Sequence, residues 1–256
     1  MTPTRLLIIK LGDTLPHMRE RLGDFEDWIC HGLRHSGKVL DIEVCDPRQG
    51  DVLPPVHASV QTESGLAGVV VTGSHAMVTD REGWSEHTAC WLRDAVANGL
   101  PVLGICYGHQ LLAHAMGGTV TNHPGGLEVG TKTIWLTDES ADDPLFGPLP
   151  SHWPVQVAHA QSVAELPPGA VLLAHNRFEP HHAYRVGDCA WGVQFHPEFD
   201  LDITRAYIEH LSGRLVGQGE SIHALNEAVQ PTPDAASLLT RFALLACNAA
   251  AGRARA

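Results

Sequence analysis

Residues 104–110 read Gly-Ile-Cys-Tyr-Gly-His-Gln, and they join an apolar run at 100–103 to a helical pattern at 110–116. Cys106 is therefore predicted at a sharp strand-to-helix turn, the arrangement of a nucleophile elbow. Gly104 and Gly108 relieve the crowding that such a turn imposes on the backbone. Free amides and the dipole at a helix N-terminus stabilise a thiolate. Cys106 is the candidate nucleophile, and a buried cysteine in a glycine-rich turn is the alternative for this motif taken alone.

A candidate acid–base pair lies at residues 191–199, Trp-Gly-Val-Gln-Phe-His-Pro-Glu-Phe. The pattern predicts an apolar strand that ends by presenting His196 and Glu198. A nucleophilic thiol needs a base, and the base needs a third group that fixes its tautomer. Pro197 disfavours helix at His196, so the two side chains leave the strand end in a fixed relation. The sequence thus predicts a Cys-His-Glu triad, although any one of the seventeen histidines is more often a surface or core residue.

These two motifs resemble those of the class I (triad-type) glutamine amidotransferases, in particular the glutaminase domain of GMP synthase and its stand-alone relatives. The resemblance covers about residues 5–212. It implies that Cys106 attacks the side-chain amide of glutamine, giving a γ-glutamyl thioester and ammonia, and then glutamate. It also implies that His196 is the general acid and base and that Glu198 orients it.

The resemblance extends to an oxyanion hole. Residues 67–74, Ala-Gly-Val-Val-Val-Thr-Gly-Ser, form a buried-strand pattern that ends in a glycine loop. The family loop lends a backbone amide to the oxyanion, and the matching position is Gly73, with the Tyr107 amide as second donor. The family loop usually reads Gly-Gly-Pro, so Thr72 and Ser74 depart from it. They resemble the loop of stand-alone members, including γ-glutamyl peptidases.

Four further residues are candidates for substrate binding by the same resemblance. Gln110 resembles the family's glutamine-binding residue, with a solvent-facing helix residue as the alternative. Glu128 resembles a loop carboxylate that holds the substrate's amino-acid end, where a charged acceptor strengthens the hydrogen bond; an exposed loop carboxylate is the alternative. His159 and Gln161 fall where the family carries a His-x-Asp-x-Val segment, so Gln161 replaces the family's Asp.

Hydrophobic periodicity predicts alternating strands and helices along the first half of the chain. This order favours an α/β fold with a mostly parallel, flavodoxin-like central sheet and helices on both faces. Its functional loops then lie at the carboxyl ends of the strands. Strands are expected at 5–10, 39–45 and 67–72, helices at 18–33, 84–97 and 201–215, a loop at 46–61, and a smaller, partly antiparallel region with strands at 131–136, 155–158, 171–174 and 183–186.

The chain is expected to consist of two parts. Residues 1–215 form the amidotransferase-like domain, and residues 216–256 form a C-terminal helical extension. The extension is rich in alanine and leucine, which predicts a helix packed on the domain. Packing on the partner subunit of a homodimer is the alternative.

Composition excludes several classes of function. The 256 residues include 29 acidic and 17 basic ones, for a formal charge of −12, which disfavours nucleic acid and anionic membranes as partners. The apolar run at 6–9 is too short for a signal peptide or a membrane span. Six cysteines without a paired spacing predict reduced thiols in the cytoplasm. No metal-ligand pattern stands out, so we expect neither a metal nor a cofactor.

Three classes of function follow from these observations. The first is a glutamine amidotransferase, and because the chain carries no phosphate-binding loop, a synthetase partner would act in trans. The second is a hydrolase that uses the same thioester chemistry on γ-glutamyl peptides. The third, a non-catalytic binding or regulatory relative, is disfavoured by the intact triad. The sequence favours glutaminase-type hydrolysis of a small-molecule substrate, with γ-glutamyl hydrolysis close behind.

Overall fold

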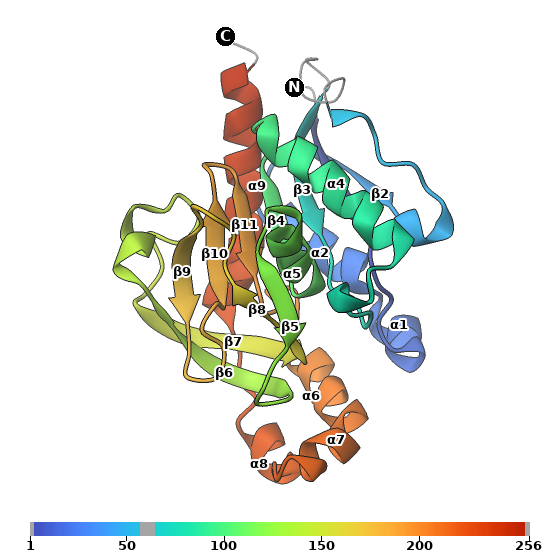
Figure 1. Cartoon of the computed structure of the whole chain (residues 1–256), viewed down its shortest axis with the longest axis vertical. Coiled ribbons are helices and arrows are strands. Elements are labelled where there is room, and N and C mark those ends of the chain that lie inside the picture. The colour runs from blue at the N-terminus through green and yellow to red at the C-terminus, as the bar shows by residue number, and fades with distance from the viewer. Residues whose placement is uncertain (1–2, 57–64, 254–256) are drawn as a thin grey trace.

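A nine-stranded sheet runs through the protein (Figure 1), a computed structural model that describes residues 3–56 and 65–253. Five neighbouring strands are parallel: β2 (Leu40–Cys45), β1 (Thr4–Ile9), β3 (Leu66–Val71), β4 (Val102–Ile105) and β11 (Ala190–Val193). The sheet continues with antiparallel strands β10 (Ala183–Val186), β9 (Val171–His175), β6 (Glu128–Leu136) and β7 (His152–His159). The predicted fold class, a mostly parallel sheet with a smaller antiparallel region, is confirmed.

Helices cover both faces of the parallel half, as the sequence predicts. Side chains of β1 alternate, so that Leu6 and Ile8 pack on one face with α2 (Phe25–Arg34) and α9 (Pro233–Arg253). Leu7 and Ile9 pack on the other face with α4 (Gly83–Ala97) and α5 (Tyr107–Ala115). Burial on two faces explains why these strands read as continuous apolar runs.

The expectation of one helix at 18–33 is wrong. The structure has two helices there, α1 (Pro16–Leu22) and α2, separated by Gly23 and Asp24. Gly23 has φ +84°, a conformation that favours glycine and ends a helix. Asp24 begins the next one with a capping box, in which its side chain accepts from the first-turn backbone and Asp27 accepts from the Asp24 amide at 2.9 Å.

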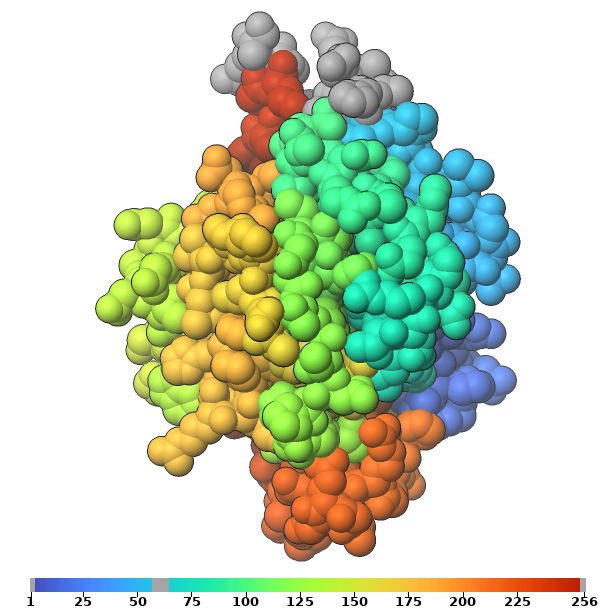
Figure 2. Space-filling model, in the orientation of Figure 1, coloured from blue at the N-terminus to red at the C-terminus, as the bar shows by residue number. Residues whose placement is uncertain are grey.

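The expected helix at 201–215 is also divided, into α6 (Leu201–His210) and α7 (Ser212–Gly217), at Leu211, whose φ −90° and ψ 4° depart from helical values. With α8 (Ile222–Glu227) these helices lie beyond the carboxyl edge of the sheet (Figure 1), and Figure 2 shows them as a compact lobe (orange) at one end of the molecule. A separate two-stranded sheet, β5 (Thr119–Asn122) with β8 (Gln161–Glu165), was not predicted. The other elements among the described residues are 3₁₀ helices at Pro47–Gln49, Val78–Asp80 and Asp138–Asp142. The first of them lies within the expected loop at 46–61, whose last five residues are outside the described range.

Helix α9 packs on the sheet along one face. Two glycines allow its close approach, one on α2 and one on β3: a Cβ at Gly32 would lie 2.4 Å from Leu239, and one at Gly68 would lie 3.3 Å from Phe242. By length and composition α9 could cross a membrane. Its buried face, which includes Leu238 and Phe242, instead makes it a helix of the protein core. The division of the chain at residue 215 stays a prediction, and residues 254–256 of the expected extension lie outside the described range.

The packing of α9 on the sheet is expected to contribute to the stability of the protein. Phe242→Ala is expected to lower the free energy of unfolding by about 3–5 kcal/mol, because it removes a fully buried aromatic side chain and leaves a cavity. Val216→Ala, at a side chain 61% exposed, serves as the control and should change it by less than about 0.5 kcal/mol. Urea denaturation of both variants measures the difference. Equal stability of the two would contradict the packing of α9 on the sheet.

Candidate active site

The elbow at Cys106 has a strained backbone. Cys106 stands between β4 and α5 with φ +50° and ψ −97°, a conformation that costs a residue with a Cβ about 1–3 kcal/mol. Glycines on either side make the turn possible. A Cβ at Gly104 would lie 2.4 Å from the Gly108 carbonyl oxygen, and one at Gly108 would lie 2.5 Å from the Val71 carbonyl oxygen. Strain of this kind is typical of functional positions, where surrounding structure holds the residue in place.

His196 and Glu198 form a buried pair at the end of the strand next to the elbow. Oε1 of Glu198 lies 2.7 Å from Nδ1 of His196, so the ring's Nδ1 donates to the carboxylate. Phe199 stacks on the His196 ring with centroids 3.9 Å apart. Burial by itself would lower the pKa of His196, but the Glu198 carboxylate and the sulfur of Cys106 outweigh it and raise that pKa to about 10. The ring therefore favours the imidazolium form beside Cys106.

Sheet register explains why these residues meet. Val71 of β3 pairs with Gly104 of β4, and Gly104 pairs with Gly192 of β11. Because the three strands are parallel, their carboxyl ends lie at one edge, with the loops that carry Gly73, Cys106 and His196.

The two residues predicted to supply the oxyanion donors lie beside Cys106. A Cβ at Gly73 would come within 3.0 Å of Cε1 of His196, so a larger residue would crowd the site. Tyr107 is the first residue of α5, where an amide has no intrahelical acceptor. Thr72 shapes the loop: its hydroxyl accepts from the Leu11 amide at 2.9 Å and donates to the Gly73 carbonyl at 2.9 Å. This departure from the family's Gly-Gly-Pro thus supplies a side chain that holds the loop.

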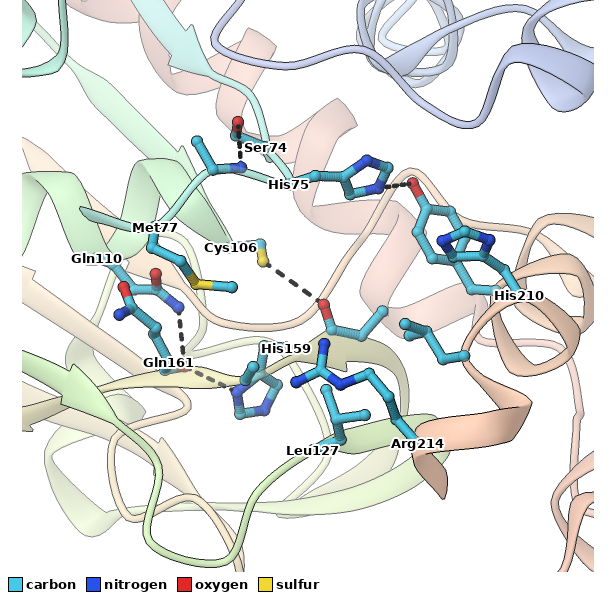
Figure 3. A pocket seen from close by; sticks show the side chains of 15 residues that line it. Ser74, His75, Met77, Cys106, Gln110, Leu127, His159, Gln161, His210 and Arg214 are labelled. Carbon is cyan, nitrogen blue, oxygen red and sulfur yellow. Dashed lines mark hydrogen bonds between the residues drawn. The ribbon is translucent and has the colours of Figure 1, made fainter. Parts of the chain in front are cut away.

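Cys106 faces a cavity of about 230 Å³. Its walls are the loop at 74–77, the elbow, the turn between β7 and β8, and helices α6 and α7 (Figure 3). Three of the predicted substrate residues line it: Gln110, His159 and Gln161. Nε2 of Gln110 donates to the Gln161 carbonyl at 2.9 Å and to Oε1 of Gln194 at 3.0 Å.

The fourth predicted residue, Glu128, is not part of this cavity's lining. It is buried behind His159, and its Oε2 lies 3.0 Å from Nε2 of His159 and 3.3 Å from Nε2 of His182. Its Oε1 accepts from Asn176 at 2.7 Å. Burial favours the neutral acid, but the two histidines outweigh it and hold the pKa of Glu128 well below its usual range. Glu128 therefore orients His159, whereas the sequence predicted a carboxylate that holds the substrate's amino-acid end, and that role stays a prediction.

Several cavity residues had no distinguishing signal in the sequence. His75 and Tyr207 join across the cavity wall, with Nε2 3.1 Å from the hydroxyl, and burial lowers the pKa of His75. Tyr207 also lies 3.1 Å from the Thr14 hydroxyl. His210 and Arg214 reach the cavity from α6 and α7 (Figure 3). Helical periodicity predicted the helix that carries Tyr207 and His210, but not which of its residues meet the site.

Comparisons with known proteins agree with this architecture. The GMP synthase (glutamine-hydrolyzing) of Thermomicrobium roseum is 37% identical over 131 residues, 51% of this chain and 23% of that protein. The enzyme of the same name from Porphyromonas gingivalis is 35% identical over 136 residues, 53% of this chain and 25% of that protein. The chain thus spans about a quarter of the length that these two relatives have.

Solved structures share the fold. A glutamine amidotransferase from Thermotoga maritima superposes with a TM-score of 0.73 at 19% identity, covering 94% of this chain and 97% of that one. A glutamine amido transferase from Methylobacillus flagellatus gives 0.63 at 24% identity, covering 99% and 94%. The model of the family described as glutamine amidotransferase class-I matches residues 22–211. With most of its length matched, the chain belongs to the class I glutamine amidotransferase family.

Proposed function

We propose that the protein hydrolyses the side-chain amide of glutamine through a γ-glutamyl thioester on Cys106, releasing ammonia and then glutamate. The observation that carries the proposal is the buried His196–Glu198 pair beside a cysteine held in a strained elbow. A third class of function, non-catalytic binding, would not need a nucleophile held with φ +50° next to an oriented imidazole.

In the proposed acylation, the thiolate of Cys106 attacks the amide carbon of the substrate. The developing oxyanion accepts hydrogen bonds from the amides of Gly73 and Tyr107. The raised pKa of His196 keeps its ring protonated at neutral pH, so the ring can give its proton to the leaving nitrogen as the carbon–nitrogen bond breaks.

In the proposed deacylation, water attacks the thioester carbonyl. Neutral His196 takes a proton from this water, and the carbon–sulfur bond breaks to release glutamate and restore the thiolate. Glu198 holds the ring by Nδ1 throughout, so Nε2 carries out both transfers.

Substrate positioning is assigned to the cavity residues. Gln110 and Gln161 lie on one side of Cys106 (Figure 3). Oε1 of Gln161 is buried and has no hydrogen-bond partner among the described residues, so it can accept from the α-ammonium of the substrate. Glu128 acts through His159, which it holds at 3.0 Å.

A second candidate function, hydrolysis of γ-glutamyl peptides, is favoured by the extent of the cavity. It continues past Cys106 to His210 and Arg214, which leaves space for a leaving group larger than ammonia. For the glutaminase function, a synthetase partner in trans would consume the ammonia. We propose a cytoplasmic location, with which six free thiols agree.

Glutamate release tests the proposal. The purified protein is assayed on glutamine and on a panel of γ-glutamyl peptides, with Cys106→Ala as the control. Cys106-dependent release from glutamine supports the glutaminase function, and a preference for the peptides supports the second candidate. Release that persists in Cys106→Ala would refute both.

A further inference from the structure

The charge of the cavity differs from that of the whole protein. The chain has a formal charge of −12, yet among the described residues no carboxylate lines the cavity at Cys106. Its basic residues are three histidines, at 75, 159 and 210, and Arg214. The guanidinium of Arg214 therefore gives this lining a positive charge that no carboxylate of the lining balances, and such a charge attracts anions.

Arg214 is the permanently charged member of this set. It lies in α7, and its side chain is directed into the cavity, toward His159 (Figure 3). No acidic side chain in the described part of the chain pairs with its guanidinium. Arg205, one helix earlier, lies outside the cavity and is 3.8 Å from Asp202. The guanidinium of Arg214 is thus available for a ligand.

We propose that Arg214 binds a carboxylate of the substrate and so selects γ-glutamyl compounds by their negative charge. A guanidinium offers two parallel donors that match a carboxylate. This inference rests on the proposed function for its choice of substrate, but the charge at the site can be tested without turnover. Arg214 is a specificity residue here and takes no part in the bond-breaking steps.

Two carboxylates can meet Arg214, and substrate analogues distinguish them. The α-carboxylate belongs to the acyl half: glutaramate keeps it, and 4-aminobutanamide lacks it. The other belongs to the leaving group: γ-glutamylglycine has it, and γ-glutamyl methylamide lacks it. Arg214→Gln should lower kcat/KM by roughly 10- to 100-fold only for substrates that carry the recognised carboxylate.

The pattern of losses identifies the source. If Arg214→Gln lowers kcat/KM for glutamine and glutaramate but not for 4-aminobutanamide, the α-carboxylate binds at Arg214. If the variant lowers kcat/KM for γ-glutamylglycine but not for γ-glutamyl methylamide, the carboxylate of the leaving group binds there. Arg214→Lys should retain part of the preference, because it keeps the charge but loses the paired donors. Arg205→Gln is the matched control. Equal losses on all substrates, or none, would overturn the proposal.

Alkylation of Cys106 tests the positive charge of Arg214 without requiring catalysis. The thiolate displaces iodide from anionic iodoacetate or from neutral iodoacetamide, forming a carbon–sulfur bond in each case. Peptide mass spectrometry gives the rate of alkylation by iodoacetate divided by the rate by iodoacetamide at Cys106. The exposed Cys90 is an internal reference. We expect this ratio to fall roughly tenfold at Cys106 in Arg214→Gln and to stay constant at Cys90.

The two measurements separate failure of the function from failure of this inference. An Arg214-dependent alkylation ratio in a protein that releases no glutamate would reject the glutaminase proposal and keep the anion site. The opposite result would keep the function and reject the site: the protein releases glutamate, but neither the alkylation ratio nor the substrate preference changes in Arg214→Gln.

Discussion

Cys106→Ala is expected to lower glutamate release by roughly 10⁴-fold or more, since a thioester needs a thiol and no other described cysteine lines the cavity. The fold should remain, because alanine keeps the Cβ that Cys106 already places at φ +50°. Assays of glutamate release, with thermal unfolding of the same samples, measure both effects.

Cys90→Ala is the matched control. Cys90 is an exposed free thiol on α4, away from the cavity lining, so its removal should change neither activity nor unfolding temperature. Wild-type activity in Cys106→Ala would refute the assignment of the nucleophile.

Glu198→Gln is expected to lower kcat by roughly 10²- to 10⁴-fold. The carboxylate accepts from Nδ1 of His196 at 2.7 Å and stabilises the imidazolium. A neutral amide retains the shape but not the charge, and its NH₂ group can hold the ring in the wrong tautomer.

The same variant should change the pH profile. Loss of the His196 proton limits activity on the alkaline side, because neutral imidazole cannot protonate the leaving nitrogen. The pKa of about 10 for His196 places that limb near pH 10 in the wild type. Glu198 is a cause of the raised pKa, so its removal should move the limb to lower pH.

The pH dependence of kcat/KM, which reports the pKa values of the free enzyme, checks this expectation for both proteins. Glu20→Gln, an exposed carboxylate on α1, serves as the control for loss of one negative charge. A Glu198→Gln enzyme with an unshifted alkaline limb would show that the carboxylate does not set the protonation of His196.

Much of the fold could be predicted from local patterns. The strand expected at 67–72 is a short apolar run, and the one at 183–186 combines aromatic and β-branched residues with one arginine; the structure has β3 and β10 there. The break at Gly23 and Asp24 was missed because apolar residues keep a helical period across it. Here the glycine conformation and the capping box outweigh periodicity. The pair β5–β8 was missed because its strands are short and joined by contacts distant in the chain.

Roles within the site divide in the same way. Cys106, His196 and Glu198 stand in dense motifs, whose glycines and proline restrict the backbone within a few residues. No such dense motif surrounds Glu128, which only a resemblance singled out, or Arg214. One is a buried carboxylate behind His159, and the other faces the cavity from a helix about a hundred residues beyond Cys106 in the sequence.

The sequence by itself therefore determined the elbow, the His-Pro-Glu strand end, the alternation that makes a parallel sheet, and the family. These depend on backbone restrictions and apolar periods that act between near neighbours. Only the tertiary structure decided which side chains share a cavity with Cys106, because that depends on how distant helices pack. In the structure, Glu128 lies behind His159 and outside the cavity lining, whereas Arg214 is part of that lining. An acidic protein therefore has an arginine and no carboxylate in the lining around Cys106.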